Sequence, residues 1–583
     1  MRHILSRSWA ALAALGLLAG GTALAAPQAP RALGLIVKLK DASSHEQSAA
    51  LGQPQAGTER MQAVVRDVGM AVRKVSPTGR AAQRLDFDHV LTADEAKTLA
   101  AKLQARPDVE WVVPNELERR LALPSDPMYP KTAFTTGQWW LQPVSGANGN
   151  VARDRMRGVP GVQNAWDTTK GSSSITIAVL DSGITTHNDL AGARLWPGYD
   201  FVSEIEYAND GDGRDSSPQD PGDWVTSNDL TNPLFEGCDV ESSSWHGTTT
   251  TGIAAAASND GVGVAGVNWV SPVLPVRVSG KCGATVADIV DGMRWAAGLA
   301  VSGVPTNPHP ARVINLSFGG SAACNAAYQD AINELAALKV VLVAPAGNES
   351  AAPTRPANCS GVVGVAAVNR DGFKASYSNF GASIQISTVG GDSNQIGNWG
   401  GSVNDDGMLT ITNSGTSTPS SGSYANEFGT SFSTPLVSGV VSLMLSVNPN
   451  LTTAQVIDGL KKSARPHVTS PVLGACANSN PGRCACTTST CGAGLLDAPQ
   501  ALVYAANPGG YVVPSWPTVV IDTPELRAAA ANGNDLPPNG LSDDPSTPTT
   551  PPISPPGSGG GGALGFGWLL GVLAAVIALR RRP

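Results

Sequence analysis

The sequence predicts an α/β fold, because short apolar runs typical of buried strands alternate with segments of helical spacing. Three of these runs, at 175–181, 313–317 and 340–348, contain β-branched residues and end in polar residues. The segment 436–444 instead has apolar residues at helical spacing, and it follows the small residues of 429–435. Functional groups in open α/β sheets lie at the carboxyl ends of strands. The polar residues that end these runs are therefore candidates for a functional site.

Three polar residues in separate segments have the chemistry of a hydrolytic site. Asp181 ends the first strand, His246 opens a segment of small residues, and Ser431 lies where the later helix starts. A hydroxyl in a first helical turn lies near the positive end of the helix dipole, which stabilises developing negative charge. A serine becomes a nucleophile when a histidine takes its proton, and that histidine needs a carboxylate to orient it. Alone, Ser431 could be a helix cap, but Asp181 and His246 favour the catalytic interpretation.

In this order the three segments resemble the catalytic blocks of the subtilisin-like serine proteases, over about residues 130–503. The resemblance implies a subtilisin-like three-layer fold with a central, mainly parallel sheet, in a catalytic domain over residues 122–506. It implies a serine endopeptidase that acts on protein or peptide substrates, with the three residues above as its triad. The sequence departs from the family at Thr249–Thr251, outside the triad. The alternative is a catalytically idle surface binding protein on a protease scaffold.

Asn348 follows a buried strand and a glycine, and it is the candidate oxyanion residue. The tetrahedral intermediate of acyl transfer carries an oxyanion that needs preorganised hydrogen-bond donors. A side-chain amide and the backbone N–H of the nucleophile would supply them. The alternative is a turn residue with a left-handed backbone. The segment also resembles the oxyanion block of the family, which favours the catalytic role.

Substrate binding is expected at the end of the strand at 313–317. By resemblance, Ser317, Phe318 and Gly319 form an exposed edge that pairs with a substrate peptide as an added strand. Such backbone pairing recognises no particular side chain of the substrate, which implies that the enzyme cleaves many different sequences. Thr354 would lie near the floor of the side-chain pocket, and a loop without substrate contact is the alternative.

The first residues have the features of an export signal. Two arginines precede a short apolar core, and Ala23–Ala25 has the small residues of a cleavage site, so residues 1–25 are expected to be a signal peptide. Export to the cell envelope or surface of a Gram-negative bacterium, and then to the medium, is the expected localisation.

Residues 26–121 are expected to form a small separate unit. A strand is predicted at 35–40, a helix at 93–105 that stops before Pro107, and a strand at 109–113. This pattern resembles the family's prodomain, a small α/β sandwich. The resemblance implies an autoprocessed zymogen whose own prodomain is an intramolecular inhibitor. An ordinary N-terminal domain that stays attached is the alternative.

The chain has eight cysteines, an even number that predicts disulfides in an exported protein. Their order suggests the pairs Cys238–Cys282 and Cys324–Cys359, while the four between 476 and 491 are expected to pair among themselves. A zinc site in that group is the rival, disfavoured by the absence of a histidine among them. The net charge of -8 gives no electrostatic reason to expect a nucleic-acid partner.

Two places predict structural calcium, which binds oxygen ligands. The glycine-rich loop 209–223 concentrates carboxylates that would repel one another without a cation, and a solvated acidic insertion is the alternative there. The second place rests on the resemblance, which implies three side-chain ligands and two backbone carbonyls. The predicted ligands are Asp210, Asp212, Asp215, Asp220 and Asp223 in the loop, and Asp126, Asp189, Asp260 and the carbonyls of Val262 and Val264 at the second place.

The composition changes after Asn507, where Pro, Gly, Ser and Thr predict a disordered linker over residues 507–562. An apolar stretch at 563–579 is just long enough to span a bilayer, and Arg580–Arg582 would stay in the cytoplasm. With the preceding glycine run, residues 563–583 resemble the glycine-glycine sorting signals of Gram-negative bacteria. The resemblance implies transient membrane anchoring and removal by a rhomboid-type sorting protease. A permanent transmembrane anchor is the alternative.

Overall fold

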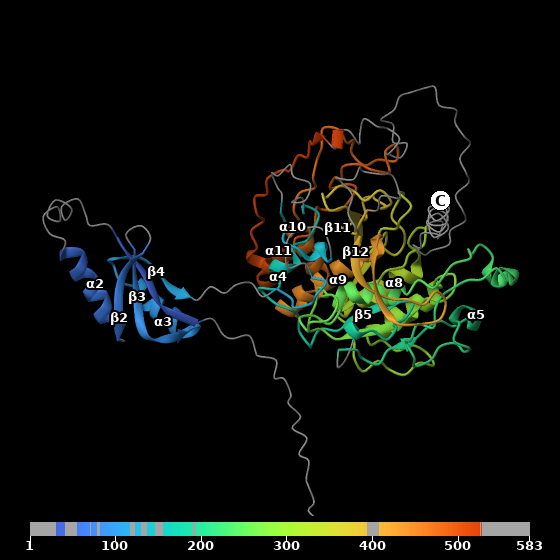
Figure 1. The fold of residues 1–583 in the computed structure, drawn as a ribbon, viewed down its shortest axis with the longest axis horizontal. Coiled ribbons are helices and arrows are strands. Elements are labelled where there is room, and N and C mark those ends of the chain that lie inside the picture. The colour runs from blue at the N-terminus through green and yellow to red at the C-terminus, as the bar shows by residue number, and fades with distance from the viewer. Residues whose placement is uncertain are drawn as a thin grey trace, which may run out of the picture. The chain divides into compact units, whose positions relative to one another are not determined.

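A computed structural model of the protein describes residues 31–40, 55–69, 71–78, 82–116, 123–129, 137–145, 156–190, 194–392, 407–524 and 526–527. The chain divides into two compact units, within residues 1–121 and 122–583 (Figure 1).

The N-terminal unit is a four-stranded antiparallel sheet with two helices. Its elements are β1 (Arg31–Leu39), α2 (Gln55–Val68), β2 (Val72–Thr78), β3 (Ala82–Thr92), α3 (Ala93–Gln104) and β4 (Val109–Glu116). The strand order is β2-β3-β1-β4. Val64 of α2 and Leu103 of α3 share one apolar core with Leu35 and Leu85 of the sheet. The predicted strand, helix and strand are all present, and this unit has a core of its own.

The large unit is built on a seven-stranded sheet in which every neighbouring pair of strands is parallel. The strand order is β11-β10-β9-β8-β5-β7-β6. These strands are β5 (Ile177–Asp181), β6 (Tyr199–Asp200), β7 (Val273–Arg277), β8 (Val313–Leu316), β9 (Val341–Pro345), β10 (Val363–Val368) and β11 (Ile386–Val389). All side chains of β5, β7, β8, β9, β10 and β11 are buried, as expected of a sheet covered on both faces.

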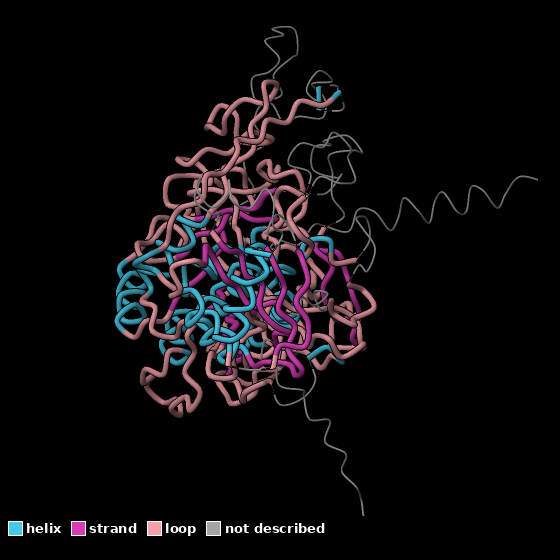
Figure 2. The backbone as a smooth tube through the Cα atoms, turned by 90° about the vertical axis from the view of Figure 1, so that its left-hand side faces the viewer, coloured by secondary structure: helices cyan, strands magenta, loops and turns pink. Residues whose placement is uncertain are grey.

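Helices pack on both faces of this sheet, where they form two apolar cores with it, and Figure 2 shows them among the strands. The α-helices of the large unit among the described residues are α4 (Val162–Ala165), α5 (Ile205–Ala208), α6 (His246–Ala255), α7 (Val286–Ala296), α8 (Ala326–Ala337), α9 (Thr430–Val447), α10 (Thr453–Ser463) and α11 (Ala498–Ala506). In β9, Val341 and Val343 belong to the core that contains α9 and α11, whereas Leu342 and Ala344 belong to the core that contains α7 and α8. Alternate strand residues thus face opposite helix layers. The subtilisin-like three-layer architecture expected from the sequence is confirmed.

α9 is the central helix of its layer. It is the single helix of the described residues that is long and apolar enough to cross a membrane, and it is buried inside the unit. Its length and hydropathy are therefore those of a core helix. A separate antiparallel hairpin, β12 (Met408–Asn413) and β13 (Gly422–Glu427), precedes it and contacts α6.

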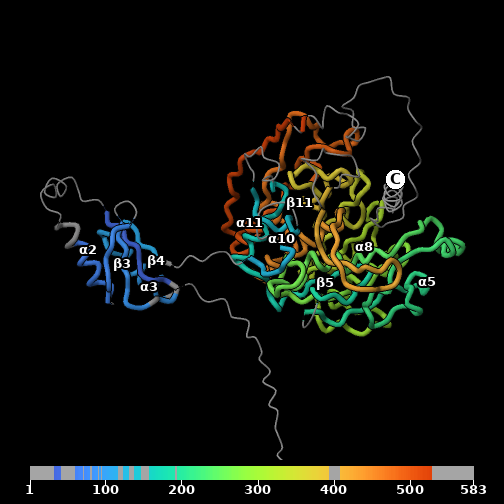
Figure 3. Tube along the Cα trace, in the orientation of Figure 1, coloured from blue at the N-terminus to red at the C-terminus, as the bar shows by residue number. Residues whose placement is uncertain are grey.

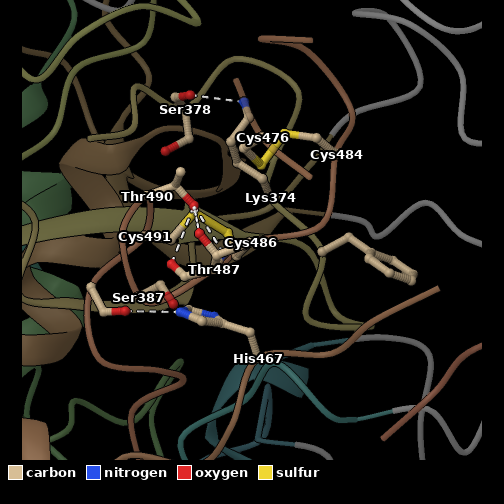
Figure 4. The surroundings of a disulfide bond; sticks show 12 residues. Lys374, Ser378, Ser387, His467, Cys476, Cys484, Cys486, Thr487, Thr490 and Cys491 are labelled. Carbon is tan, nitrogen blue, oxygen red and sulfur yellow. Dashed lines mark hydrogen bonds between the residues drawn. A yellow bond between two sulfur atoms is a disulfide. The ribbon is translucent and has the colours of Figure 1, made fainter. Parts of the chain in front are cut away.

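Four disulfides link the eight cysteines. The two suggested pairs, Cys238–Cys282 and Cys324–Cys359, are present. The late group forms two neighbouring bonds, Cys476–Cys484 and Cys486–Cys491 (Figure 4). The sulfur atoms of Cys476, Cys486 and Cys491 lie within 4.8 Å of one another. Since none of the cysteines is free, these sulfurs offer no thiolate for the rival zinc site.

The chain does not leave the large unit at Asn507, so the domain boundary predicted there is wrong. The segment after α11 continues along the unit (Figure 3), where the backbone N–H of Thr469 donates to Val519 O at 3.0 Å and that of Ile521 donates to Thr469 O at 2.8 Å. Ile521 and Leu526 are 3% and 1% exposed and join the α9 core. The composition of 507–527, rich in proline, glycine and threonine, predicts a spacer, but its residues Ile521 and Leu526 are buried.

We expect Ile521→Ala to lower the free energy of unfolding by about 2–5 kcal/mol, because it leaves a cavity in a packed core. The matched control is Val512→Ala in the same segment, at a side chain that is 82% exposed, and it should change stability by less than about 0.5 kcal/mol. Denaturant unfolding of both variants measures the difference. Equal effects would show that the segment is not part of the folded unit.

Candidate active site

Asp181 is a buried carboxylate at the carboxyl end of β5. Its Oδ1 accepts hydrogen bonds from the backbone N–H of Ser182 and from Nδ1 of His246, both at 2.8 Å. Its Oδ2 accepts from the hydroxyl of Thr250 at 3.2 Å. Because a carboxylate can only accept, the proton of the His246 ring must be on Nδ1, which leaves Nε2 free to accept one. Thr250 lies in the segment that departs from the family. Its hydrogen bond to Asp181 could not be predicted from the sequence.

His246 begins α6, and the residue before it has an unusual backbone. Trp245 has φ 52° and ψ 27°, the left-handed region that a bulky side chain rarely adopts. Its indole Nε1 donates to Gly415 O, in the loop of the β12–β13 hairpin, at 2.6 Å. Ser243 is bound to the same loop through its backbone N–H, which donates to Thr416 O at 2.9 Å. The hairpin loop therefore holds the segment that leads into His246.

Ser431 lies in the first turn of α9, as predicted. Its hydroxyl donates to Ser317 O at 3.2 Å, and Ser317 Oγ donates to Ser431 O at 2.9 Å. Ser431 O needs this partner because the residue four positions later is Pro435, which has no N–H to continue the helix ladder. The His246 ring lies 5.5 Å from that of Phe432, the neighbour of Ser431. Ser431 therefore lies against the end of β8, and its neighbour Phe432 lies against the His246 ring.

Asn348 follows β9 and lies against the same helical turn. Its Oδ1 accepts from the backbone N–H and from the hydroxyl of Thr430, both at 2.9 Å. Since the amide oxygen is fixed in this way, the amide N–H₂ is the end left to donate elsewhere. Asn348 has no left-handed backbone, so the alternative interpretation as a left-handed turn residue does not apply.

The predicted substrate-binding residues lie next to these groups. The Phe318 ring is 5.3 Å from that of His246. Thr354 is buried, and its Oγ1 lies 2.6 Å from the position that a β-carbon on Gly319 would take. Its Cγ2 similarly lies 2.8 Å from a β-carbon on Gly347. Thr354 therefore fills the space between the two glycines, and neither position tolerates a side chain.

The second predicted calcium place brings three carboxylates together. Asp126 Oδ2 accepts from the backbone N–H of Asn259 at 2.7 Å, and Asp189 Oδ2 accepts from that of Val264 at 2.9 Å. Asp260 Oδ1 accepts from Val262 N–H at 2.9 Å. Asp126 and Asp189 are fully buried, and the Oδ1 of each has no partner among the described residues.

The charges of this cluster oppose one another. Burial raises the pKa of Asp126 to about 6, and the neighbouring Asp260 and Asp189 carboxylates add to that effect. Burial likewise raises the pKa of Asp189. Buried, mutually repelling carboxylate oxygens without donors are the arrangement that a divalent cation would stabilise.

The structure separates the five calcium ligands predicted in the loop 209–223 into two groups. Asp210, Asp212, Asp215 and Asp220 line a cavity of about 440 Å³, between their loop and the β12–β13 hairpin. Asp210 forms an ion pair with Arg277 at 2.6 Å. Asp223 is not in that lining, and its carboxylate accepts from the N–H and the hydroxyl of Ser244, both at 2.6 Å.

Carboxylates around His246 set its protonation. Burial of the ring opposes the charged form, but the carboxylates of Asp181, Asp223 and Glu427 outweigh it, so the pKa of His246 lies above its usual value. Burial raises the pKa of Glu427 to about 7, and the charge of His246 opposes that rise. Glu427 ends β13, and no sequence signal connects it with the histidine.

We expect Glu427→Gln to lower the pKa of His246, because it removes a negative charge that stabilises the imidazolium. The histidine would then stay neutral to a lower pH. NMR titration of the His246 ring measures this shift. Glu241→Gln is the matched control, since burial raises the pKa of Glu241 to about 7 beside Asp223 and Asp239. An unchanged His246 titration in Glu427→Gln would contradict the assignment.

Comparison with known proteins agrees with this geometry. The profile of the Subtilase family matches residues 172–493. The chain is 35% identical over 510 residues to an extracellular protease of Xanthomonas campestris pv. campestris, covering 86% of this chain and 78% of that protein. It is 33% identical over 434 residues to the extracellular basic protease of Dichelobacter nodosus, covering 73% and 66% respectively.

A solved structure is also similar. It is described as proteases from Pseudoalteromonas arctica, with 40% identity and a TM-score of 0.55, covering 66% of this chain and 100% of that chain. The family profile spans more than half of the chain, and the long relatives are extracellular proteases. The chain therefore belongs to the subtilase family and is a subtilisin-type serine endopeptidase.

Proposed function

We propose that this chain is a secreted endopeptidase that hydrolyses peptide bonds through Asp181, His246 and Ser431. The observation that carries the proposal is the 2.8 Å bond from His246 Nδ1 to Asp181, beside the helical turn that holds Ser431. In the reaction, His246 Nε2 takes the Ser431 proton as the oxygen attacks the scissile carbonyl, and returns it to the leaving amine. Ser431 Oγ must first turn from Ser317 O toward the histidine, since apo contacts of this kind tighten with substrate.

We expect Ser431→Ala to abolish peptide hydrolysis while the fold persists, because it removes the nucleophile and almost no volume. The intact chain should react with a fluorophosphonate probe, and the variant should not. Ser433→Ala, at a buried serine two residues further along α9, is the matched control and should keep the labelling. A folded wild-type chain that the probe does not label would favour the catalytically idle binding protein instead.

The oxyanion hole is the next part of the proposal. The Asn348 amide and the backbone N–H of Ser431 would donate to the oxyanion of the tetrahedral intermediate. The bonds from Thr430 to Asn348 Oδ1 support this, because they tie the side chain to the residue before the nucleophile. The peptide would pair with the backbone of Ser317–Gly319, and its side chain would reach toward Thr354.

The N-terminal unit is proposed to be the intramolecular inhibitor of a zymogen that processes itself. Its support is that residues 31–116 form a unit with its own apolar core. The segment 117–122 between this unit and the large one lies outside the described residues.

Structural calcium is proposed at the cluster of Asp126, Asp189 and Asp260, because its two buried oxygens without partners fit a cation that prefers oxygen ligands. The carbonyls of Val262 and Val264 would complete the ligand set. Calcium bound there would neutralise the mutual repulsion of the carboxylates. For the acidic loop, calcium stays a proposal that rests on its lining carboxylates alone.

We expect chelation to lower the thermal midpoint of the wild-type protein, since a ligand of the native state stabilises it by about 2.7 kcal/mol at a hundred times its Kd. In Asp189→Asn the midpoint should be lower from the start and should respond less to the chelator than that of the wild-type protein. Asp167→Asn is the control, as burial raises the pKa of that carboxyl without placing it in the cluster. Calorimetry with and without calcium decides, and an unchanged chelator response in Asp189→Asn would sink this site.

Export and sorting complete the proposal. The named extracellular relatives support export of this chain. The signal peptide at 1–25, the remainder of the linker after residue 527 and the sorting segment at 563–583 lie outside the described residues. A rhomboid-type protease would remove the last segment after transient membrane anchoring, leaving the enzyme at the surface and then in the medium of a Gram-negative bacterium.

We expect the mature protein from its native host to begin after about residue 121, because the proposed prodomain is removed after the signal peptide, and to lack the segment from about Gly559 onward. Mass spectrometry of the intact secreted protein measures both ends. Deleting Arg580–Arg582 should retain the uncut form inside the cell, because the positive residues fix the orientation of the span. A secreted form that still carries these arginines would mean a permanent anchor.

A further inference from the structure

We infer that Lys374 is a positioning residue for catalysis, whose ammonium shapes the turn Ala375–Asn379 and, through this turn, holds Asn348 in place. The inference rests on the proposed oxyanion role of Asn348. Neither the triad nor the calcium cluster uses Lys374.

Lys374 is a lysine with no solvent exposure, which is rare for this residue type. Its Nζ donates to Ala375 O at 2.8 Å and to Ser376 O at 3.1 Å. It also donates to Ser378 O at 2.8 Å (Figure 4). An ammonium has three protons, so these three carbonyls use all of them. The turn thus wraps around one internal cation.

The surroundings balance the cost of burying this charge. Burial lowers the pKa of Lys374 to about 7, and the Asp392 carboxylate opposes that fall. Asp392 is itself buried and accepts from the N–H and hydroxyl of Ser376 at 3.0 and 2.7 Å. The Phe380 ring lies 5.6 Å from Nζ and offers its negative face to the cation. The cation and the turn are therefore fixed to each other from several sides.

The same turn holds the segment that carries Asn348. The Asn379 N–H donates to Gly347 O at 2.9 Å, and Asn379 Oδ1 accepts from the N–H of Glu349 at 2.9 Å. Asn379 Nδ2 donates to Glu349 Oε2 at 2.6 Å, and that oxygen also accepts the Asn348 N–H at 3.0 Å. The residues on both sides of Asn348 are thus bound to Asn379.

A second connection runs through Ser350. Its N–H donates to Tyr377 O at 2.8 Å, and its hydroxyl donates to Ser376 O at 2.6 Å, the same carbonyl that Lys374 binds. Ser350 has a φ of 54°, a conformation that needs such external support.

Asn348 is therefore held from two directions. Thr430 fixes its side-chain oxygen from the start of α9, and the turn around Lys374 fixes its backbone. An oxyanion donor is effective only when it is preorganised, so loss of either support should reduce turnover more than substrate binding.

The test uses the full chain, with active enzyme counted by fluorophosphonate labelling and kcat and KM measured on a chromogenic peptide. Lys374→Met keeps the apolar stem and removes the ammonium. We expect kcat to fall by about tenfold with KM within about twofold, the pattern of a lost transition-state interaction. The control is Lys170→Met, which removes an ammonium that also donates to a carbonyl, Trp166 O, and lies over a ring, that of Trp269. It should leave kcat unchanged.

A double-mutant cycle with Asn348→Ala separates positioning from a general structural role. Asn348→Ala alone should lower kcat by about 10²–10³-fold. Adding Lys374→Met to it should then cost little more, because Lys374 acts through Asn348. An equal loss from Lys374→Met in both backgrounds overturns the inference, whereas normal turnover in Asn348→Ala would overturn the proposed oxyanion role.

If Lys374→Met does not fold, Ser350→Ala carries the test, since it removes only the hydroxyl bond to Ser376 O. It should lower kcat by a smaller factor, and that loss should also disappear in the Asn348→Ala background. A normal kcat in Ser350→Ala, or a loss that persists without Asn348, would contradict the inference.

Discussion

The whole site depends on one constraint, which is that the N-terminus of α9 must lie against the carboxyl ends of β8 and β9. Ser431 and Ser317 exchange two hydrogen bonds there, and Thr430 binds Asn348. Because the seven strands are parallel, their carboxyl ends share one edge of the sheet, and Asp181 ends β5 beside β8 on that edge. Because α9 is buried along most of its length, its packing in the apolar core fixes the position of Ser431, the proposed nucleophile.

The core residues and the bonds at the helix start therefore have complementary tasks. Alternate side chains of β9 anchor the helix layers on both faces, which fixes the distance between α9 and the sheet. Pro435 then leaves one helix carbonyl unbonded, and Ser317 uses it. Packing sets the coarse position of Ser431, and these few polar contacts set its direction.

The sequence predicts the parts of this arrangement that are local. Apolar runs that end in Asp181 and Asn348, and a serine before a helical pattern, are visible because each depends on neighbours in the chain. The sequence did not predict the roles of Thr250, Trp245 and Glu427, because their partners lie far away in the chain and no local pattern indicates these contacts. The same holds for Ile521: the prolines, glycines and threonines of its segment predict a spacer, and only the pairing with Thr469 shows that the segment packs on the unit.

The support of Trp245 by the hairpin loop has a consequence for the stage of synthesis at which the chain can first become active. Trp245 is bound to Gly415, 170 positions later, and Ser431 follows still further on. A ribosome that has made the first four hundred residues has produced Asp181 and His246, but neither the loop that holds the segment before the histidine nor Ser431, the proposed nucleophile. The catalytic geometry is thus incomplete until Ser431 has been made, so the first four hundred residues alone lack the capacity to cut.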